Sequence, residues 1–458
     1  MLTKLRAKNF KSWKDTGELE LAPLTGLFGS NSSGKTSILQ MLLMLKQTVE
    51  SPDRRRVLHT GDERSLVDLG TYFDLIHGHQ ENASLDFSYS WNVVKPIVIY
   101  DPEQLNKELF SISDFTFKYK IIGEGGRAVV DSFLYEFERY KFGMKRLPGN
   151  EIGNAIKDQY ELVHDNYNAK KIRGRAWPLP PPVKCYGFPD EATGYYQNTG
   201  FLSDFVLSFE ESFSNMTYLG PLREYPKRSY LWAGERPLDV GRRGEQAMAA
   251  LLAARAEKIK IGRLVKKQRR YEPLEDRILE WMREMNLIYS FSLDPVAKHR
   301  KEYECRVKKT ATSSEVLITD VGFGVSQILP VLVLCYYVPE HSTILLEQPE
   351  IHLHPSVQAW LADVLIDVVN ERNVQIIVES HSEHFIRRLQ RRIAEEKIAP
   401  DKTALYFCRV ENGESRIERL QIDLFGNILN WPEQFFGDEL GDLAEKTRAT
   451  MRRQGIID

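Results

Sequence analysis

The pattern of apolar and polar positions divides the chain into regions of different character. Between residues 84 and 137, three segments place apolar or aromatic side chains at every second position, as in Leu85, Phe87, Tyr89 and Trp91. Such alternation predicts antiparallel strands with one buried face. The first forty residues instead predict strands, a glycine-rich loop and a helix, and the last third repeats short apolar runs separated by helical patterns. That rhythm is typical of the parallel sheet in an α/β protein.

Several further elements can be assigned from the same pattern. The helix after the glycine-rich loop carries the mostly apolar stripe Ile38, Leu39, Leu42, Leu45 and Val49, which predicts burial against a sheet. The other assignments are strands at 343–347 and 375–379, a helix near 357–370 between them, charged helices over 245–285, an irregular proline-rich stretch at 178–182, and a hairpin that turns at Asn412-Gly413.

Composition and charge narrow the class of protein. The chain has 458 residues, 42% of them hydrophobic, and its 62 Lys and Arg face 64 Asp and Glu, for a net charge of −2. This length predicts one large domain with an insertion or two smaller ones, and the balanced charge argues against a surface that is basic throughout. Four widely separated cysteines predict a reducing compartment. The N-terminus lacks the apolar core of a signal peptide, and no apolar run approaches the ~20 residues of a membrane-spanning helix, so we predict a cytoplasmic protein without membrane contact.

The strongest chemical signal is a glycine-rich loop with the spacing of a P-loop. It consists of Gly29, Ser30, Asn31, Ser32, Ser33, Gly34, Lys35 and Thr36, with Ser37 following in the predicted helix. Glycines allow backbone N–H groups to curl around phosphates, and the helix N-terminus adds a positive dipole end. Lys35 is expected to reach the β- and γ-phosphates, and the Thr36 hydroxyl to bind Mg²⁺.

Two other strands are predicted to end in polar residues at the same sheet edge. The run 343–347 ends in Glu347, a carboxylate that can hold Mg²⁺ or its water shell, and is followed by Gln348 and Glu350. The run 375–379 is followed by His381, which can polarise a γ-phosphate or orient an attacking water. Taken singly, a histidine at a strand end is more often structural.

A fourth segment, 320–330, has the pattern of a capped helix start. Here Ser326 is predicted as the N-cap and Pro330 falls in the first turn, where a missing N–H is tolerated. Such a helix start is a potential anion site, although an ordinary capped helix explains the segment equally well in isolation.

In this order, the four elements resemble the ABC-type ATPases of the SMC, RecF and OLD-like group. The segment Glu347 to Pro355 is similar to that of bacterial AAA-family ATPases with an EQPEIHLHP Walker B region, many of which lie in anti-phage defence operons. The resemblance extends to the segments 67–74, 218–223, 239–245 and 431–436. It implies an α/β fold: a P-loop ATPase head with a mixed sheet built from both ends of the chain. The predicted parts are residues 1–95 and 301–458 for the head, 96–214 for an inserted β-rich and helical region, and 215–300 for a charged helical segment.

The resemblance also implies a set of site residues and cofactors. Residues 29–36 would be Walker A, Glu347 the Walker B carboxylate and His381 the switch histidine, with ATP and Mg²⁺ as cofactors. The segment with Gly324, Ser326 and Gln327 would correspond to the signature that contacts the γ-phosphate of a partner subunit, which implies a dimer or larger homo-oligomer.

One position departs from the wider ABC pattern. Gln348 occupies the place of the usual catalytic glutamate. A glutamine can orient water but cannot accept its proton, so we predict slow hydrolysis with Glu350 contributing as a base.

Partners are predicted from what the chain lacks. Fewer than 80 residues follow His381, and they lack a DxD-type acidic cluster. The resemblance therefore implies an ATPase that acts with a separate effector, for instance an HNH nuclease as in Septu-type defence pairs. A DNA-stimulated repair or recombination ATPase and a nucleotide-bound scaffold without turnover remain as alternatives.

Two further interpretations stay open. The basic run 258–270 could contact nucleic acid, although a charged helix face is more often only solvated. The carboxylates and histidines near the two strand ends could instead form a transition-metal site, the set being Glu347, Glu350, His352, His354, His381 and His384.

Overall fold

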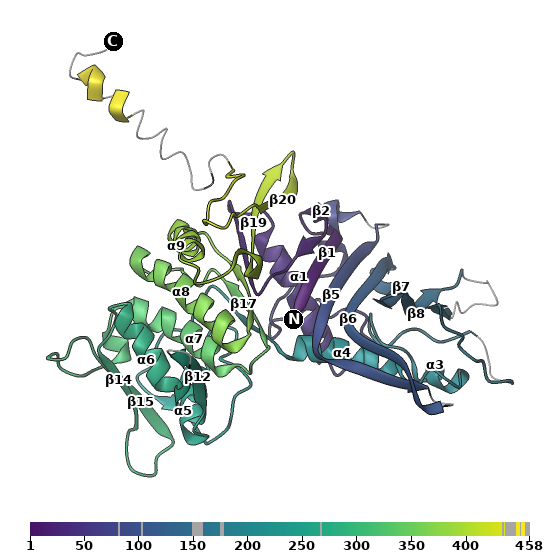
Figure 1. The fold of residues 1–458 in the computed structure, drawn as a ribbon, viewed down its shortest axis with the longest axis horizontal. Coiled ribbons are helices and arrows are strands. Elements are labelled where there is room, and N and C mark those ends of the chain that lie inside the picture. The colour runs from purple at the N-terminus through teal and green to yellow at the C-terminus, as the bar shows by residue number, and fades with distance from the viewer. Residues whose placement is uncertain are drawn as a thin grey trace.

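A computed structural model describes residues 1–80, 83–101, 104–148, 159–174, 178–265, 268–432, 435, 446–448 and 450–453. Two large sheets dominate it, one mainly parallel and one antiparallel, and they lie beside each other with the first helix, α1 (Lys35–Glu50), close to both (Figure 1). The predicted α/β class is thereby confirmed.

The six-stranded sheet is built from both ends of the chain, as expected. Its order is β10 (Met216–Leu219), β17 (Thr343–Glu347), β18 (Gln375–Glu379), β4 (Leu24–Gly29), β19 (Thr403–Glu411) and β20 (Glu414–Leu420). All neighbours are parallel except the β19–β20 hairpin, so the sheet is mixed. Each of the central strands is buried on both sides, which explains why they are short apolar runs without alternation.

Two hydrophobic cores cover the two faces of this sheet. On one face, Leu27, Leu345 and Ile377 join a core that includes α1 and α4 (Leu202–Ser214). On the other face the core includes five helices: α5 (Ala247–Ala256), α6 (Leu274–Glu284), α7 (Phe323–Tyr337), α8 (Pro355–Arg372) and α9 (Glu383–Ala394). This three-layer arrangement holds the carboxyl ends of β4, β17 and β18 at one edge.

The antiparallel sheet contains the alternating segments. Its order is β2 (Trp13–Asp15), β1 (Leu2–Phe10), β5 (Leu85–Asp101), β6 (Gln104–Glu124), β7 (Arg127–Phe137), β8 (Tyr140–Arg146) and β9 (Tyr160–Asp165), with β3 (Leu19–Glu20) also paired to β1. Aromatic side chains of its inner face pack on α4, as in the pair of Trp91 with Phe209 of α4 at 5.8 Å between ring centroids. Because β5 runs through residue 95, the predicted boundary between the head and an insertion at 95/96 falls inside a strand that continues the sheet of β1.

The segment predicted as charged helices is only partly helical. The basic run lies in a hairpin formed by β12 (Lys260–Val265) and β13 (Gln268–Pro273), between α5 and α6. The helical prediction for this run is wrong over the described residues; Lys266 and Lys267 lie outside them. Tertiary contacts fix the hairpin: Arg263 donates to Glu280 of α6 at 2.8 Å, and the Leu264 N–H donates to Glu371 of α8 at 2.9 Å.

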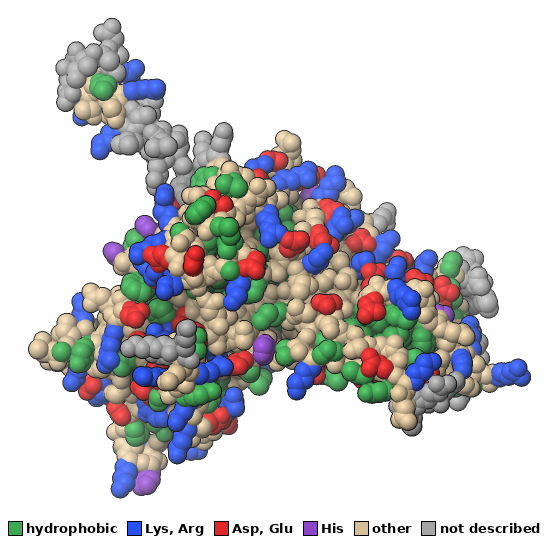
Figure 2. All heavy atoms as spheres, viewed as in Figure 1, with side chains coloured by type: hydrophobic (Ala, Val, Ile, Leu, Met, Phe, Trp, Pro, Cys, Tyr) green, Lys and Arg blue, Asp and Glu red, His purple; other side chains and the backbone are tan. Residues whose placement is uncertain are grey.

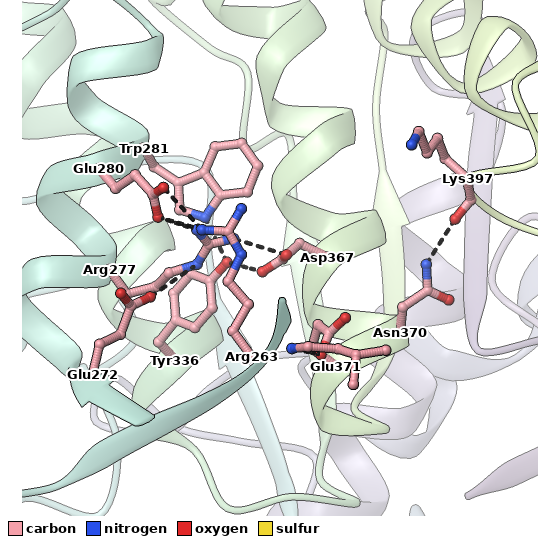
Figure 3. Close-up of polar contacts among 11 residues, drawn as sticks. Arg263, Glu272, Arg277, Glu280, Trp281, Tyr336, Asp367, Asn370, Glu371 and Lys397 are labelled. Atoms are coloured by element: carbon pink, nitrogen blue, oxygen red, sulfur yellow. Dashed lines mark hydrogen bonds and ion pairs between the residues drawn. The ribbon is translucent and has the colours of Figure 1, made fainter. Parts of the chain in front are cut away.

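Behind this hairpin lies a buried ionic cluster centred on Arg277 of α6 (Figure 3). Its guanidinium forms ion pairs with Asp367 at 2.7 Å and with Glu280, and lies 4.7 Å from the centre of the Trp281 ring. Tyr336 of α7 donates to Asp367 and accepts from the Trp281 indole, each at 2.6 Å. The cluster thus ties α6, α7 and α8 together.

The remaining named elements of the described structure are smaller. They are α2 (Tyr72–Leu75), α3 (Asp190–Tyr195), β11 (Tyr230–Leu231), β14 (Ser290–Pro295), β15 (Glu302–Lys308), β16 (Val316–Leu317) and the 3₁₀ turns His77–His79, Ile318–Asp320 and Pro400–Lys402. The predicted hairpin at Asn412-Gly413 is confirmed as β19–β20.

Candidate functional site

The glycine-rich loop connects β4 to α1, and its two outer glycines are required by the backbone. Gly29 has a φ of 133°, and a Cβ atom there would lie 1.9 Å from the Cys408 carbonyl oxygen of β19. Gly34 has a φ of 92° and is the N-cap of α1. Its carbonyl oxygen accepts a hydrogen bond from the buried Trp13 indole at 3.0 Å. The loop is therefore held in a curl that only glycine permits at both ends.

Lys35 lies folded under this loop. Its Nζ donates to the carbonyl oxygens of Ser30 at 2.6 Å and Gly29 at 3.1 Å, and the side chain is buried. Burial lowers the pKa of Lys35, and the nearby Glu379 carboxylate partly offsets this effect. The ammonium group is thus placed where phosphate oxygens bound by the loop would meet it.

A cavity of about 290 Å³ opens above the loop. It is lined by Lys11, Ser12, Asn31, Ser32, Ser33, Gly34, Lys35, Thr36, Ser37, Gln348, Glu379 and His381. The structure thus brings together most of the predicted loop residues with Gln348 and His381, while Gly29 and Ser30 serve to hold Lys35. Lys11 and Ser12 were not expected here, because they lie between β1 and β2 and belong to no motif.

Glu379 is the residue that sequence reasoning missed. It ends β18, the strand that lies directly beside β4, and its Oε1 accepts a hydrogen bond from the Thr36 hydroxyl at 3.0 Å. Its Oε2 is buried and has no hydrogen-bond partner among the described residues. Burial, reinforced by the neighbouring Glu347, raises the pKa of Glu379 to about 7. The signal available in the sequence was that both predicted strands, 343–347 and 375–379, end in glutamate.

Glu347 lies one strand further from the loop than expected. It pairs in register with Glu379, and β18 separates its strand β17 from β4. Its Oε2 accepts a hydrogen bond from the Tyr218 hydroxyl of β10 at 2.6 Å. Burial raises the pKa of Glu347, and the Tyr218 hydrogen bond and Arg223 oppose the shift.

Glu350 is buried beside His381. Its Oε1 accepts from the His381 backbone N–H at 2.6 Å and from the Ser380 hydroxyl at 2.8 Å. Its Oε2 has no partner among the described residues, and burial raises the pKa of the carboxyl group. Glu350 is not among the residues that line the cavity, so in this structure it positions His381, and its predicted role as a base remains a prediction.

Gln348 and His381 face the cavity from the two strand ends. Gln348 has a φ of 43°, and its backbone N–H donates to the Glu379 carbonyl oxygen at 2.9 Å, which fixes the turn after β17. Burial, and then the Lys35 ammonium, lower the pKa of His381, so its imidazole is neutral near pH 7. Both side chains can therefore offer hydrogen bonds without adding charge.

The segment predicted as a signature is arranged differently from the expectation. Helix α7 begins at Phe323 with Gly322 as its N-cap, so Ser326 is not the cap and Pro330 lies in the helix interior. Ser326 donates to the Phe323 carbonyl oxygen at 2.8 Å, and Gln327 is only 2% exposed. Both side chains are buried, so Gly322, Phe323 and Gly324 form the surface at the start of α7.

The transition-metal interpretation finds no support in the geometry. Across the described part of the chain, no three His, Cys, Asp or Glu side chains gather as a metal site. His354 instead caps α8 by accepting from the Ser356 N–H, and His352 packs against the Phe323 ring at 5.3 Å. The oxygen donors Thr36, Glu379 and Glu347 do suit Mg²⁺, which is commonly held by one or two carboxylates together with phosphates. The orphaned Oε2 of Glu379 fits such a cation.

Comparison with solved structures finds heads of SMC proteins. An SmcHead bound to the C-winged helix domain of ScpA has 12% identity and a TM-score of 0.43, covering 92% of this chain and 98% of that one. The SMC head domain from Thermotoga maritima has 13% identity and a TM-score of 0.40, covering 92% and 99%. A Pyrococcus furiosus Smc head with an extended coiled coil, bound to the C-terminal domain of ScpA, has 11% identity and a TM-score of 0.40, covering 98% and 99%. No curated protein matches the chain.

Comparison with protein families finds two families that match different parts of the chain. Residues 398–445 match a family described as a protein of unknown function (DUF3696). None of the helices in the described ranges is both long and apolar enough to cross a membrane. Residues 1–166 and 254–386 match the family described as AAA ATPase domain, which supports ATPase activity in general and implies nucleotide binding. The chain belongs to this AAA ATPase family, and the prediction of an AAA-family ATPase is confirmed.

Proposed function

We propose that the protein is an ATP-binding switch that hydrolyses its nucleotide slowly, with Mg²⁺ as cofactor. The observation that carries this proposal is the cavity over the glycine-rich loop, where Lys35 and Thr36 lie opposite Gln348 and His381. Adenine is preferred over guanine only on the resemblance to ABC-type ATPases.

The glycine-rich loop would bind the phosphates, and the strand ends would supply the groups that hold Mg²⁺ and act in hydrolysis. Backbone N–H groups of residues 31–36 and the N-terminus of α1 bind the phosphates, and Lys35 exchanges its two carbonyl partners for phosphate oxygens. Thr36, Glu379 and Glu347 would hold Mg²⁺ or its water shell, and the cation neutralises charge on the phosphates when bound. His381, held through its backbone by Glu350, is positioned to donate to the γ-phosphate or to a water molecule.

Slow turnover follows from the side chains that reach the cavity. Gln348 can orient a water molecule but cannot take its proton. Glu350 has one carboxylate oxygen occupied by Ser380 and His381 and lies outside the cavity lining. Hydrolysis therefore lacks a well-placed strong base, and the nucleotide-bound state is long-lived.

Assembly into a dimer or larger homo-oligomer is part of the same proposal. Exposed aromatic residues surround the start of α7: Phe323 is 39% exposed and packs on Tyr225, which is 73% exposed. A second copy that covered this surface would bring Gly322 and Gly324 toward its own nucleotide, so turnover would depend on protein concentration. A separate effector protein, such as an HNH nuclease, would then bind the assembled form and act in anti-phage defence, as the resemblance implies.

Phosphate release from ATP by the purified chain tests the proposal. We expect slow release that rises more than linearly with protein concentration and disappears in Lys35→Ala, while Lys402→Ala, an exposed lysine on another face, behaves as the wild type. Gln348→Glu should accelerate release by about 10- to 100-fold, because a carboxylate can accept the proton of the attacking water. Absence of both ATP binding and turnover in the wild type would overturn the proposal, and binding without turnover would favour the scaffold alternative.

A DNA-stimulated ATPase is a second candidate, favoured by the β12–β13 hairpin. Lys260, Arg269 and Arg270 are exposed on it, although Arg269 also pairs with Glu340 at 3.2 Å. Over the molecular face drawn in Figure 2, basic and acidic side chains are interspersed. DNA-stimulated hydrolysis that is lost in an Arg269→Ala/Arg270→Ala double variant would support this candidate, whereas co-purification of a nuclease from the native host would support the defence proposal.

A further inference from the structure

The order of the strands places a different carboxylate beside the glycine-rich loop from the one that the Walker B pattern indicates. Strand β18 lies between β17 and β4, and Glu379 pairs in register with Leu27 on one side and with Glu347 on the other. Glu379 is therefore the carboxylate closer to the loop strand, and Glu347 is a full strand further away.

The side chain of Glu379 is fixed toward the cavity. It is 1% exposed, it belongs to the cavity lining, and its Oε1 accepts the Thr36 hydroxyl at 3.0 Å. Thr36 is the P-loop residue whose hydroxyl is expected to bind the cation, so the hydrogen bond places the Glu379 carboxylate within reach of the same position.

The other carboxylate oxygen of Glu379 lacks a partner. Its Oε2 is buried without a hydrogen bond in the described part of the protein, and the nearby Lys35 Nζ donates to Gly29, Ser30 and Ser33 instead. A buried carboxylate oxygen that is left unsatisfied is costly, and a bound cation removes that cost. Glu347 differs, because the Tyr218 hydroxyl already occupies its Oε2 at 2.6 Å.

We propose that Glu379 is a direct ligand of the divalent cation that accompanies the nucleotide, together with Thr36, and that Glu347 acts from outside this inner set. Two hard oxygen donors on the protein side leave the remaining positions to phosphate oxygens and water, which is the usual arrangement for Mg²⁺. This inference rests on the proposed nucleotide site, because the cation is shared with the phosphates.

The first test measures metal binding rather than turnover. Mn²⁺ is titrated into the full chain with the non-hydrolysable analogue AMP-PNP, and free Mn²⁺ is followed by electron paramagnetic resonance. We expect Glu379→Gln to weaken Mn²⁺ binding by about tenfold or more, since even residues that only support metal ligands cost 10- to 100-fold when changed. Glu347→Gln should cost less than Glu379→Gln. Glu411→Gln, at the end of β19 in the same sheet and paired with Arg409, is the control and should bind as the wild type.

A second variant separates ligation from a structural effect. In Glu379→Cys a thiolate replaces the carboxylate, so the affinity for Cd²⁺ relative to Mn²⁺ should rise by about tenfold or more over the wild type, because soft thiolates select softer metals. The corresponding Glu347→Cys change should shift this ratio less. A structural role alone would lower binding of both metals without changing the ratio.

The outcomes distinguish this inference from the proposed function. Nucleotide affinity measured in EDTA, with Lys35→Ala beside it, reports on the nucleotide site without any metal. If the wild type binds no nucleotide, the proposed function fails. If nucleotide binds but Glu379→Gln keeps wild-type Mn²⁺ affinity, or if Glu347→Cys rather than Glu379→Cys shifts the metal preference, then Glu379 is not the ligand and the inference is overturned.

Discussion

Two buried arginines in different regions of the molecule have opposite surroundings. Arg277, in the helical region behind the β12–β13 hairpin, is 2% exposed and is paired with Asp367 and Glu280 (Figure 3). Arg223, which follows β10 near the strand ends, is 5% exposed, and none of its three guanidinium nitrogens has a hydrogen-bond partner among the described residues. Burial lowers the pKa of Arg223 to about 10, although Tyr218, Glu350 and Glu347 are near enough to oppose the shift.

This difference distinguishes a charged residue that stabilises the fold from charged residues that belong to a binding site. Buried polar groups in folded proteins are nearly always satisfied, as Arg277 is. At the strand ends, by contrast, Arg223, Glu350 and Glu379 all carry buried atoms without partners, whereas among the described residues of the Arg277 cluster only Glu272 Oε1 lacks a hydrogen bond, and it lies 3.9 Å from Arg277 Nε. Buried charged groups without partners are concentrated at binding sites, where a bound ligand supplies the missing partner. We therefore assign Arg223, Glu350 and Glu379, here called the strand-end cluster, to ligand binding and the Arg277 cluster to structural rigidity.

The largest expected loss of stability comes from replacing Arg277, the arginine whose charge is paired. Arg277→Ala should lower the free energy of unfolding by about 3 kcal/mol, the lower end of the range for a broken buried ion pair, because Asp367 and Glu280 lose their counter-ion but are only partly buried, with 18% and 37% of their side chains exposed. Denaturant unfolding followed by circular dichroism measures this change. Arg269→Ala, whose ion pair with Glu340 is about half exposed on both sides, should cost at most about 1 kcal/mol. Equal losses in the two variants would contradict the structural role assigned to the Arg277 cluster.

Features that depend on local sequence could be predicted. The glycine-rich loop, the strands at 343–347 and 375–379 and the hairpin at Asn412-Gly413 were all expected, because each depends on local spacing or on a single run of apolar residues. Loop residues 31–37, Gln348 and His381 were also expected at one site, and the cavity contains them.

What could not be predicted depends on neighbours in space. The insertion of β18 between β17 and β4 is set by strand order, so the contact between Thr36 and Glu379 has no local signature. Likewise α7 begins at Phe323 and contains Pro330 in its interior, where the proline ring lies close to Gly244, a residue distant in the sequence. The basic run became a hairpin held by Glu280 and Glu371, contacts from α6 and α8 that no helical periodicity in the run reveals.

A smaller effect should come from removing the unsatisfied carboxylate of Glu379, and its size depends on pH. The pKa of Glu379 is raised to about 7 in the folded protein from the ordinary value of 4.5, mainly by burial. The folded state therefore binds this proton more tightly than the unfolded state, and the associated stability is present below pH 4.5 and is lost as pH rises through 7. Above pH 7 the wild type carries a buried, desolvated charge that Glu379→Gln lacks. The variant should be more stable by about 1–3 kcal/mol at pH 8, and the difference should shrink toward pH 5.

Melting curves of the two proteins without nucleotide or divalent metal, taken at pH 5 and pH 8, measure this difference. Glu411→Gln again serves as the control, since its carboxylate is exposed and paired with Arg409. A Glu379→Gln protein that is less stable than the wild type at pH 8 would show that the carboxylate is satisfied in solution, and the strand-end cluster would then resemble the Arg277 cluster.

The smallest expected effect comes from replacing Arg223, and it tests the difference between the two arginines directly. Arg223→Met keeps the length and the apolar stem of the side chain but removes a charge that has no hydrogen-bonded partner to lose. Its stability should stay within about 1 kcal/mol of the wild type, because the relief of desolvation offsets the lost attraction to Glu347 and Glu350. Arg277→Met, the matched change at the satisfied site, should destabilise by several times as much. If the two methionine variants lose equal stability, burial alone governs both arginines, and unpaired charge does not mark the strand ends as a binding site.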